Sequence, residues 1–149
     1  MPILSKDSPR DGLTGKTSVE KLVAAIGYPE RISGGGGSAV LRVDGMEVSA
    51  EEADRCIRLS YALTDDEALL PTLATYAAGR MLKEDAALSY GDGRAFLWQE
   101  GPADADARAM LRLFETFMDS CDWWRERVDA LRGNAEGAAA VPETMMIRP

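Results

Sequence analysis

The sequence predicts an α+β domain in which a twisted antiparallel sheet carries three helices, in the order α-β-β-β-α-β-β-α. Three observations lead to this prediction. The chain of 149 residues has about the length of one domain. Two turn signals, Asp44-Gly45 and Gly91-Asp92-Gly93, separate short strand-like stretches, as in the hairpins of antiparallel sheets. Single strands do not alternate with helices, which argues against a doubly wound parallel sheet.

The chain divides into three segments of different character. Residues 1–16 are polar and include Ser8-Pro9-Arg10-Asp11-Gly12, so we expect a disordered lead-in. Residues 17–132 hold the strand and helix patterns and form the predicted domain. Residues 133–149 are small, polar and rich in alanine, and we expect a flexible tail there.

A first helix is predicted from Thr17 to Tyr28. Thr17-Ser18-Val19-Glu20 has the pattern of a capping box, in which the hydroxyl and the Glu side chain satisfy backbone N–H groups at the helix start. One apolar stripe follows, made of Val19, Leu22, Val23 and Ile26. Gly27 and Pro29 then end the helix.

Three strands are expected between the first and second helices. Ser33 to Ser38 contains four consecutive glycines and predicts a flexible loop. The strands are then expected at residues 39–43, 46–50 and 56–63, where strand-forming residues gather and apolar residues mostly alternate with others. An acidic connection, Glu51, Glu52 and Asp54, is expected before the third of them.

The second helix is expected to open at Asp65-Asp66-Glu67, where negative charge suits the positive end of the helix dipole. Its apolar side consists of Leu69, Leu70, Leu73, Tyr76, Ala77 and Met81. The middle of this helix is built from small residues, so another element can approach it closely. Residues 87–90 and 94–99 predict two further strands before Gly101-Pro102 breaks the chain.

The longest helix is predicted from about Ala105 to Arg132. Its apolar residues recur at spacings of four and three, which is a strong amphipathic signal: Met110, Phe114, Phe117, Cys121, Trp124, Val128 and Leu131. Trp124 lies on this stripe and is expected in the core, whereas Trp123 is expected at a rim or an interface. Phe96 and Trp98 alternate on one strand, and such a pair either docks a partner or packs in the core.

The composition argues against several classes of function. The net charge is -8 and the basic residues are scattered, whereas a nucleic-acid-binding surface needs clustered Lys and Arg. The chain has no histidine, the commonest general base and metal ligand. No stretch approaches the roughly 20 apolar residues of a membrane span. Two distant cysteines in apolar patterns indicate buried thiols in a reducing cytosol rather than a disulfide framework.

Several short motifs resemble chemical sites, and each has a simpler structural interpretation. They are Gly15-Lys16-Thr17-Ser18 as part of a phosphate loop, Gly34–Gly37 as an anion cradle, and Asp104-Ala105-Asp106, Glu51-Glu52-Asp54 and Asp65-Asp66-Glu67 as cation ligands. The first lacks the earlier glycine that the full motif needs, and a strand rather than a helix follows the second. Helix caps and solvated turns explain the acidic groups. We therefore expect no catalytic, cofactor-binding or metal-binding residues.

The ordered set of motifs resembles the class I type III secretion chaperones, the family that includes the Tir chaperone. The resemblance covers about residues 17–132. It rests on Thr17-Ser18-Val19-Glu20-Lys21-Leu22, Ala39-Val40-Leu41-Arg42-Val43-Asp44-Gly45, Ile57-Arg58-Leu59, Glu67-Ala68-Leu69-Leu70-Pro71-Thr72-Leu73, Gly93-Arg94-Ala95-Phe96-Leu97-Trp98 and the last helix with Phe114, Phe117 and Trp124.

This resemblance implies a cytoplasmic bacterial homodimer, without cofactor, that binds the N-terminal region of a secreted effector by strand addition and by helix docking in grooves. The implied effector contacts are Val19, Leu22, Val23, Ile26, Leu41, Phe96 and Trp98. The implied dimer contacts are Leu73, Ala74, Ala77 and Met81. Two alternatives stay open: a chaperone-like regulator that binds a control protein of the same secretion system, and a small enzyme that uses carboxylates.

Overall fold

The computed structural model describes residues 17–80 and 86–140, with side chains up to Gly133. The elements, in chain order, are α2 (Ser18–Ala25), β2 (Glu30–Ser33), β3 (Ser38–Val43), β4 (Met46–Ala53), β5 (Cys56–Thr64), the 3-10 turn η1 (Glu67–Leu69), α3 (Leu70–Arg80), β6 (Ala87–Gly91), β7 (Arg94–Pro102) and α4 (Ala107–Ala140). All strands pair antiparallel in one six-stranded sheet of order β2-β3-β4-β5-β7-β6. The predicted α+β class is confirmed, with one strand more than expected.

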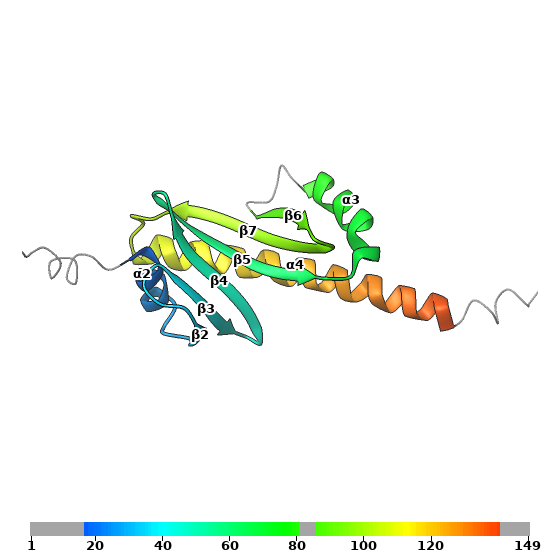
Figure 1. The fold of residues 1–149 in the computed structure, drawn as a ribbon, viewed down its shortest axis with the longest axis horizontal. Coiled ribbons are helices and arrows are strands. Elements are labelled where there is room, and N and C mark those ends of the chain that lie inside the picture. Colours follow the sequence, from blue (N-terminus) through cyan, green and yellow to red (C-terminus); the bar gives the residue numbers. More distant parts are fainter. Residues whose placement is uncertain (1–16, 81–85, 141–149) are drawn as a thin grey trace, which may run out of the picture.

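The helix α4 runs along the length of the sheet and covers one of its faces (Figure 1). The predicted apolar stripe of α4 is buried there: Met110, Phe114, Phe117, Cys121, Trp124 and Val128. The sheet meets this stripe with its inward side chains, among them Leu41, Val48, Ile57, Leu59 and Leu97. Burying a side chain of this size contributes about 1.5–3 kcal/mol, so this layer supplies most of the driving force for folding.

The start of α2 confirms the hydroxyl half of the predicted capping box, whereas the Glu20 carboxylate pairs with Arg31 instead of a backbone N–H. The Thr17 hydroxyl oxygen accepts a hydrogen bond from the Glu20 N–H at 3.1 Å and donates one to the Gly36 carbonyl at 3.0 Å, so the cap also fastens the glycine loop. The Glu20 side chain forms an ion pair with Arg31 of β2, 2.7 Å away. At the other end, Gly27 at φ +87° and paired backbone bonds close the helix as expected.

The helix α3 rests on α4 through aromatic and cationic side chains. Tyr76 meets Trp123 edge to face, with ring centroids 6.4 Å apart. The Arg80 guanidinium lies 3.7 Å above the Trp123 ring and that of Arg127 lies 4.6 Å from it. Trp123 therefore lies at an interface, as predicted, and that interface is between two helices of the same chain.

Both predicted hairpin turns are present. Asp44 and Gly45 have φ of 52° and 78°, and Asp92 and Gly93 have φ of 53° and 75°. Two successive residues with positive φ are the signature of the tight turn that suits the twist of a hairpin. These turns fix the register of β3 with β4 and of β6 with β7.

Three boundaries differ from the predictions. Strand β2 was not predicted, and the glycines form the turn between β2 and β3. Glu51 and Glu52 are not part of a connection, because β4 continues through them to Ala53 and pairs with β5. The backbone of α4 continues to Ala140, so residues 133–140 are helical rather than part of a tail. The expected lead-in at 1–16 and the rest of the expected tail lie outside the described residues.

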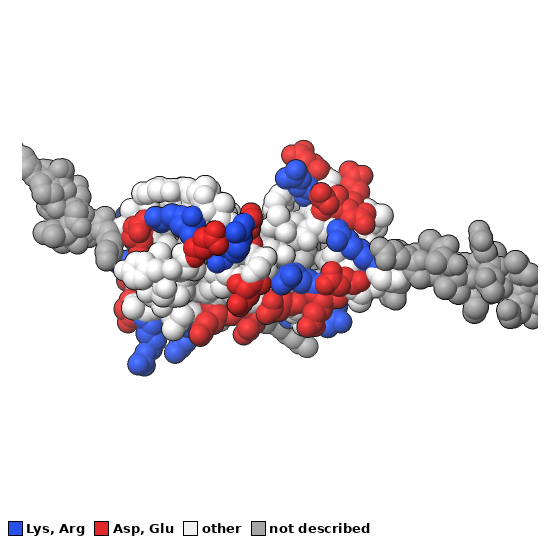
Figure 2. Space-filling view, turned by 90° about the horizontal axis from the view of Figure 1, so that it is seen from below, with Lys and Arg blue, Asp and Glu red and all other residues white. Residues whose placement is uncertain are grey.

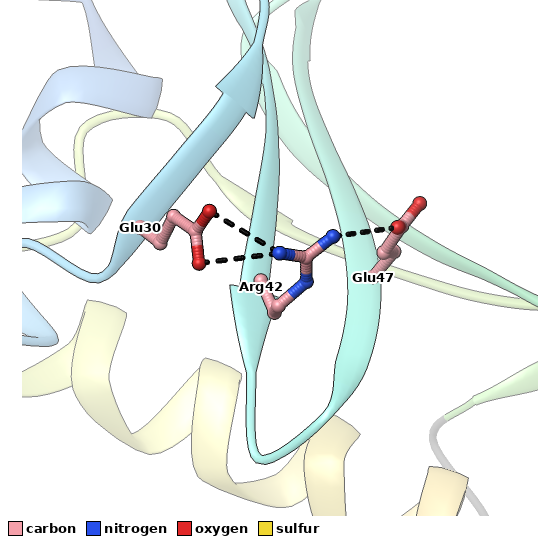
Figure 3. Close-up of polar contacts among 3 residues, drawn as sticks. All are labelled: Glu30, Arg42 and Glu47. Carbon is pink, nitrogen blue, oxygen red and sulfur yellow. Dashed lines mark hydrogen bonds and ion pairs between the residues drawn. The ribbon is translucent and has the colours of Figure 1, made fainter.

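An arginine binds the edge strand β2 to the sheet (Figure 3). One nitrogen of Arg42 on β3 lies 3.2 Å from a Glu30 oxygen on β2, and the other lies 3.3 Å from Glu47 on β4. All three side chains are about half exposed, so each pair contributes roughly 0–1 kcal/mol. The bridge therefore selects the strand register more than it stabilises the fold.

Gly34→Ala is expected to destabilise the protein by more than about 1 kcal/mol, since a side chain in the left-handed region costs this much. Gly34 has φ of +96°, and an added Cβ would lie 2.6 Å from the Ser38 carbonyl oxygen. Urea unfolding gives the free energy of unfolding. The matched control is Gly35→Ala, where an added Cβ meets nothing within 4 Å. Equal stability of the two variants would contradict the observed β2–β3 turn.

Candidate functional site

The face of the sheet opposite α4 is open and hollowed. Three adjoining hollows of about 470, 410 and 330 Å³ share Ser60 and form one surface. We call this surface the outer trough, lined by Val40, Ser49, Glu51, Arg58, Ser60, Ala62, Ser89, Phe96 and Trp98. It reaches Ser33 and Gly34 at the end of β2.

The strand register explains why this face is hollow. On β7, Trp98 stands opposite Ser60 of β5 and Ala87 of β6. Phe96 stands opposite Ala62 of β5 and Ser89 of β6. Because each large aromatic residue has small neighbours on both sides, the two rings form raised walls beside a low floor. An apolar side chain from another molecule can rest against such rings.

Polar groups fix the position of the Trp98 ring. Its Nε1–H donates to the Ser89 hydroxyl at 2.6 Å, and the Arg58 guanidinium lies 5.3 Å from the ring centroid. The Arg58 Nε–H in turn donates to Glu100 at 2.8 Å, and this carboxylate raises the pKa of Arg58. The trough therefore joins a held aromatic ring to a charged pair, a combination suited to recognition.

The thiol of Cys56 lies beside this charged pair on the same strand as Arg58. Desolvation, and then the charge of Glu100, raise the pKa of Cys56. A catalytic thiol needs the opposite, because the thiolate is the nucleophile. The surroundings of Cys56 thus favour an unreactive thiol at neutral pH.

The structure divides the residues implied as effector contacts into two groups. Val19, Leu22 and Val23 of α2 and Leu41 of β3 are at most 5% exposed and belong to the hydrophobic core. Ile26 is half-buried beside that core. Only Phe96 and Trp98 are brought together on the open face. A partner can therefore reach the aromatic pair, whereas the first group is already covered.

The residues implied as dimer contacts also differ in how far they are exposed to solvent. Leu73 is fully buried and Ala77 is half-buried, whereas Ala74 is exposed. Met81 lies outside the described residues. Thr75, Ala78 and Gly79 are exposed as well, so α3 presents a slim outward face to solvent.

The short motifs that resemble chemical sites have structural roles where the chain is described. Thr17 caps α2. An Asp66 oxygen accepts from the Ala68 N–H at 3.1 Å, and an Asp106 oxygen accepts from the Ala109 N–H at 2.8 Å, so both cap turns or helices. The described residues hold no group of three or more His, Cys, Asp or Glu arranged for a metal ion. Within them no helix is long and apolar enough to cross a membrane.

Charges of both signs are distributed over the side of the molecule shown in Figure 2. Acidic side chains gather over the lower middle of this view, with basic ones beside them. Exposed carboxylates recur along α4 at spacings of four and three, namely Glu115, Asp119, Asp122, Glu126 and Asp129. The view shows no continuous basic surface, which a phosphate backbone would require.

Sequence reasoning found the aromatic pair of the trough and missed its floor and its charged rim. Ser49, Ser60, Ser89 and Arg58 were not predicted as site residues. In the sequence, residues of this kind alternate with buried ones. On β5, for example, Arg58 and Ser60 alternate with the buried Ile57 and Leu59. That pattern identifies a second sheet face, but it does not say whether anything covers it.

Comparisons with known proteins find the fold and no sequence relative. No protein-family model matches the chain, and no curated protein matches it. A chain of the HopA1-SchA chaperone-effector complex superposes with a TM-score of 0.58 and 13% identity, covering 82% of this chain and 99% of that one. A chain of the ExsC-ExsE complex gives 0.56 and 14% identity, with coverage of 83% and 96%. The predicted resemblance to type III secretion chaperones is thus confirmed as a likeness of fold.

Glu100→Gln is expected to lower the pKa of Cys56 and so speed its alkylation, because a negative charge that opposes the thiolate is removed. The measurement is the rate of iodoacetamide labelling of Cys56 from pH 7 to 10, followed by mass spectrometry. In the unmodified protein the rate rises with pH through the raised pKa. Glu47→Gln is the control, since Glu47 pairs with Arg42 instead. Identical profiles for Glu100→Gln and the parent would contradict this assignment.

Proposed function

We propose that this chain, which shares the fold of the type III secretion chaperones, binds an incompletely folded stretch of a secreted partner on its outer trough and keeps it competent for secretion. The observation that carries the proposal is one-sided coverage of the sheet. The helices α2 and α4 cover one face, while the aromatic pair Phe96 and Trp98 remains on the other. A partner helix or an extended segment buries these rings.

The strand β2 offers the partner a backbone edge. It is the outermost strand beside β3, and all four of its residues are exposed. Ile32 is 39% exposed and the nearby Tyr28 is 70% exposed. An added strand forms main-chain hydrogen bonds with such an edge, while neighbouring side chains select the sequence. Because the trough extends to Ser33 and Gly34, one segment can occupy both.

A second copy of the chain is the other proposed partner, in the bacterial cytoplasm. The slim face of α3, with Ala74, Ala78 and Gly79, allows two helices to approach closely across a twofold axis. In this arrangement Ala74 and Ala77 contact the partner copy, and Leu73 supports the helix from the core. The two troughs of the dimer then act on one partner segment or on two.

Ala74→Arg is expected to convert the dimer to a monomer, because a long charged side chain replaces a small one at the proposed contact. Size-exclusion chromatography with light scattering gives the mass. The unmodified protein is expected near twice 16.1 kDa. Ala130→Arg, on the exposed side of α4, is the control and stays dimeric. A monomeric parent protein would contradict the proposed assembly.

Trp98→Ala is expected to weaken partner binding by more than about tenfold, since a buried aromatic anchor contributes about 2 kcal/mol or more. The partner is first identified by co-purification from the native host, and its N-terminal segment is then titrated by calorimetry. Leu111→Ala is the control, because Leu111 is exposed on α4, away from the trough. Binding through a folded domain of the partner alone, or unchanged affinity in Trp98→Ala, would contradict effector escort along this face.

A further inference from the structure

Another hollow of about 330 Å³ lies at the end of β5 and shares Ala62 with the edge of the outer trough. We call it the β5-end hollow, and it is lined by Ala62, Leu63, Thr64, Asp65, Arg94 and Arg132. Three elements meet here. The pairing of β5 with β7 shifts between Ala62 and Thr64, which sets Thr64 opposite Ala95 and so brings Arg94 close. Arg132 comes from α4. Bulges of this kind often re-aim side chains beside functional sites.

The hydroxyl of Thr64 has an unused donor in this hollow. Thr64 is only 7% exposed. Its oxygen accepts from the Asp66 N–H at 3.1 Å and from an Arg132 nitrogen at 3.3 Å. With both acceptor positions filled, the O–H hydrogen must be donated elsewhere. No acceptor for it is present among residues 17–80 and 86–133. Because Thr64 lines the hollow, this O–H hydrogen is available to a ligand bound there.

The two arginines of the hollow, one on β7 and one on α4, differ in their ion pairing from the other arginines of the sheet strands. Arg31, Arg42 and Arg58 each form an ion pair with a glutamate. Within the described residues, neither Arg94 nor Arg132 has a carboxylate within 4.0 Å. Both arginines therefore keep charged hydrogen-bond donors available beside the Thr64 hydroxyl, and such a group of donors suits an oxyanion.

We propose that the β5-end hollow binds a carboxylate, held by the guanidinium groups of Arg94 and Arg132 and by the hydroxyl of Thr64. The planar guanidinium fork matches the two oxygens of a carboxylate. Ala62 and Leu63 give the hollow an apolar wall that suits the carbon stem of a glutamate side chain or of a small organic acid. The exposed carboxylate of Asp65 opposes the ligand and limits its affinity.

The full chain, labelled with ¹⁵N, is titrated at low ionic strength with two carboxylate probes, succinate and the blocked peptide acetyl-Gly-Glu-Gly-amide. The neutral peptide acetyl-Gly-Gln-Gly-amide is the reference. Saturable amide shifts are expected at Thr64, Asp65 and Arg94 with a carboxylate probe and not with the neutral peptide. Binding of succinate alone identifies a free acid as the ligand, whereas binding of the glutamate peptide identifies a polypeptide side chain. This test needs no protein partner and is independent of the proposed function.

The variants distinguish a binding role from a structural one. Arg94→Gln and Arg132→Gln are expected to weaken binding about five- to tenfold each, because each loses a charged hydrogen bond. Asp65→Asn is expected to tighten binding about threefold, because a like charge is removed. Arg112→Gln, on an exposed part of α4 outside the hollow, leaves the affinity unchanged. Absence of saturable shifts in the parent protein, or equal affinity in the Arg94, Arg132 and Asp65 variants, would overturn the proposal.

Discussion

The rest of the structure depends on the contact between the apolar stripe of α4 and one face of the sheet. Phe117, Cys121 and Trp124 pack there against Leu59 and Leu97 of the central strands. Within residues 17–80 and 86–140, a single long helix with the short α2 beside it covers one face, and the other face has no helical layer (Figure 1). Antiparallel sheets tolerate this because alternate residues point to opposite faces. The open trough is therefore a direct consequence of how the core is built.

The open face is kept soluble and selective by its side chains. Its floor is small and polar, Arg58 on its rim is paired with Glu100 on the neighbouring strand, and its aromatic rings are few. Edge strands and exposed apolar surface favour unwanted association. On β2 the exposed Glu30 and Arg31 are bound in ion pairs, which limits that hazard while leaving the backbone edge free for a partner. At the end of β5, the register shift in the same sheet adjoins a small hollow that is lined by Arg94 of β7 and Arg132 of α4. Different sites thus arise from the register of one sheet.

The sequence predicted the features that depend on local patterns. The stripe of α4, the Thr17 cap and the two Asp-Gly turns all follow from spacing and residue type.

Strand β2 was missed because its four residues are all exposed and therefore show no alternation. The end of α4 was missed because the residues from Gly133 onward are small and polar and carry no apolar stripe, although alanine, which is common among them, is the best helix former. The stripe of α2 correctly identified an apolar face, but only the packing against α4 shows that Val19 and Leu22 are covered. Phe96 and Trp98 were identified as a pair, yet their exposure depends on neighbours from β5 and β6 that are distant in sequence.

The central claim is that one sheet face is closed by the protein itself and the other is closed only by a partner. Hydroxyl-radical footprinting of the free and partner-bound protein tests it most directly, because it reports the accessibility of individual aromatic side chains. We expect oxidation of Phe96 and Trp98 in the free protein, loss of that oxidation in the complex, and no oxidation of Phe117 or Trp124 in either state. Equal oxidation of Phe96 and Trp98 in both states would contradict it.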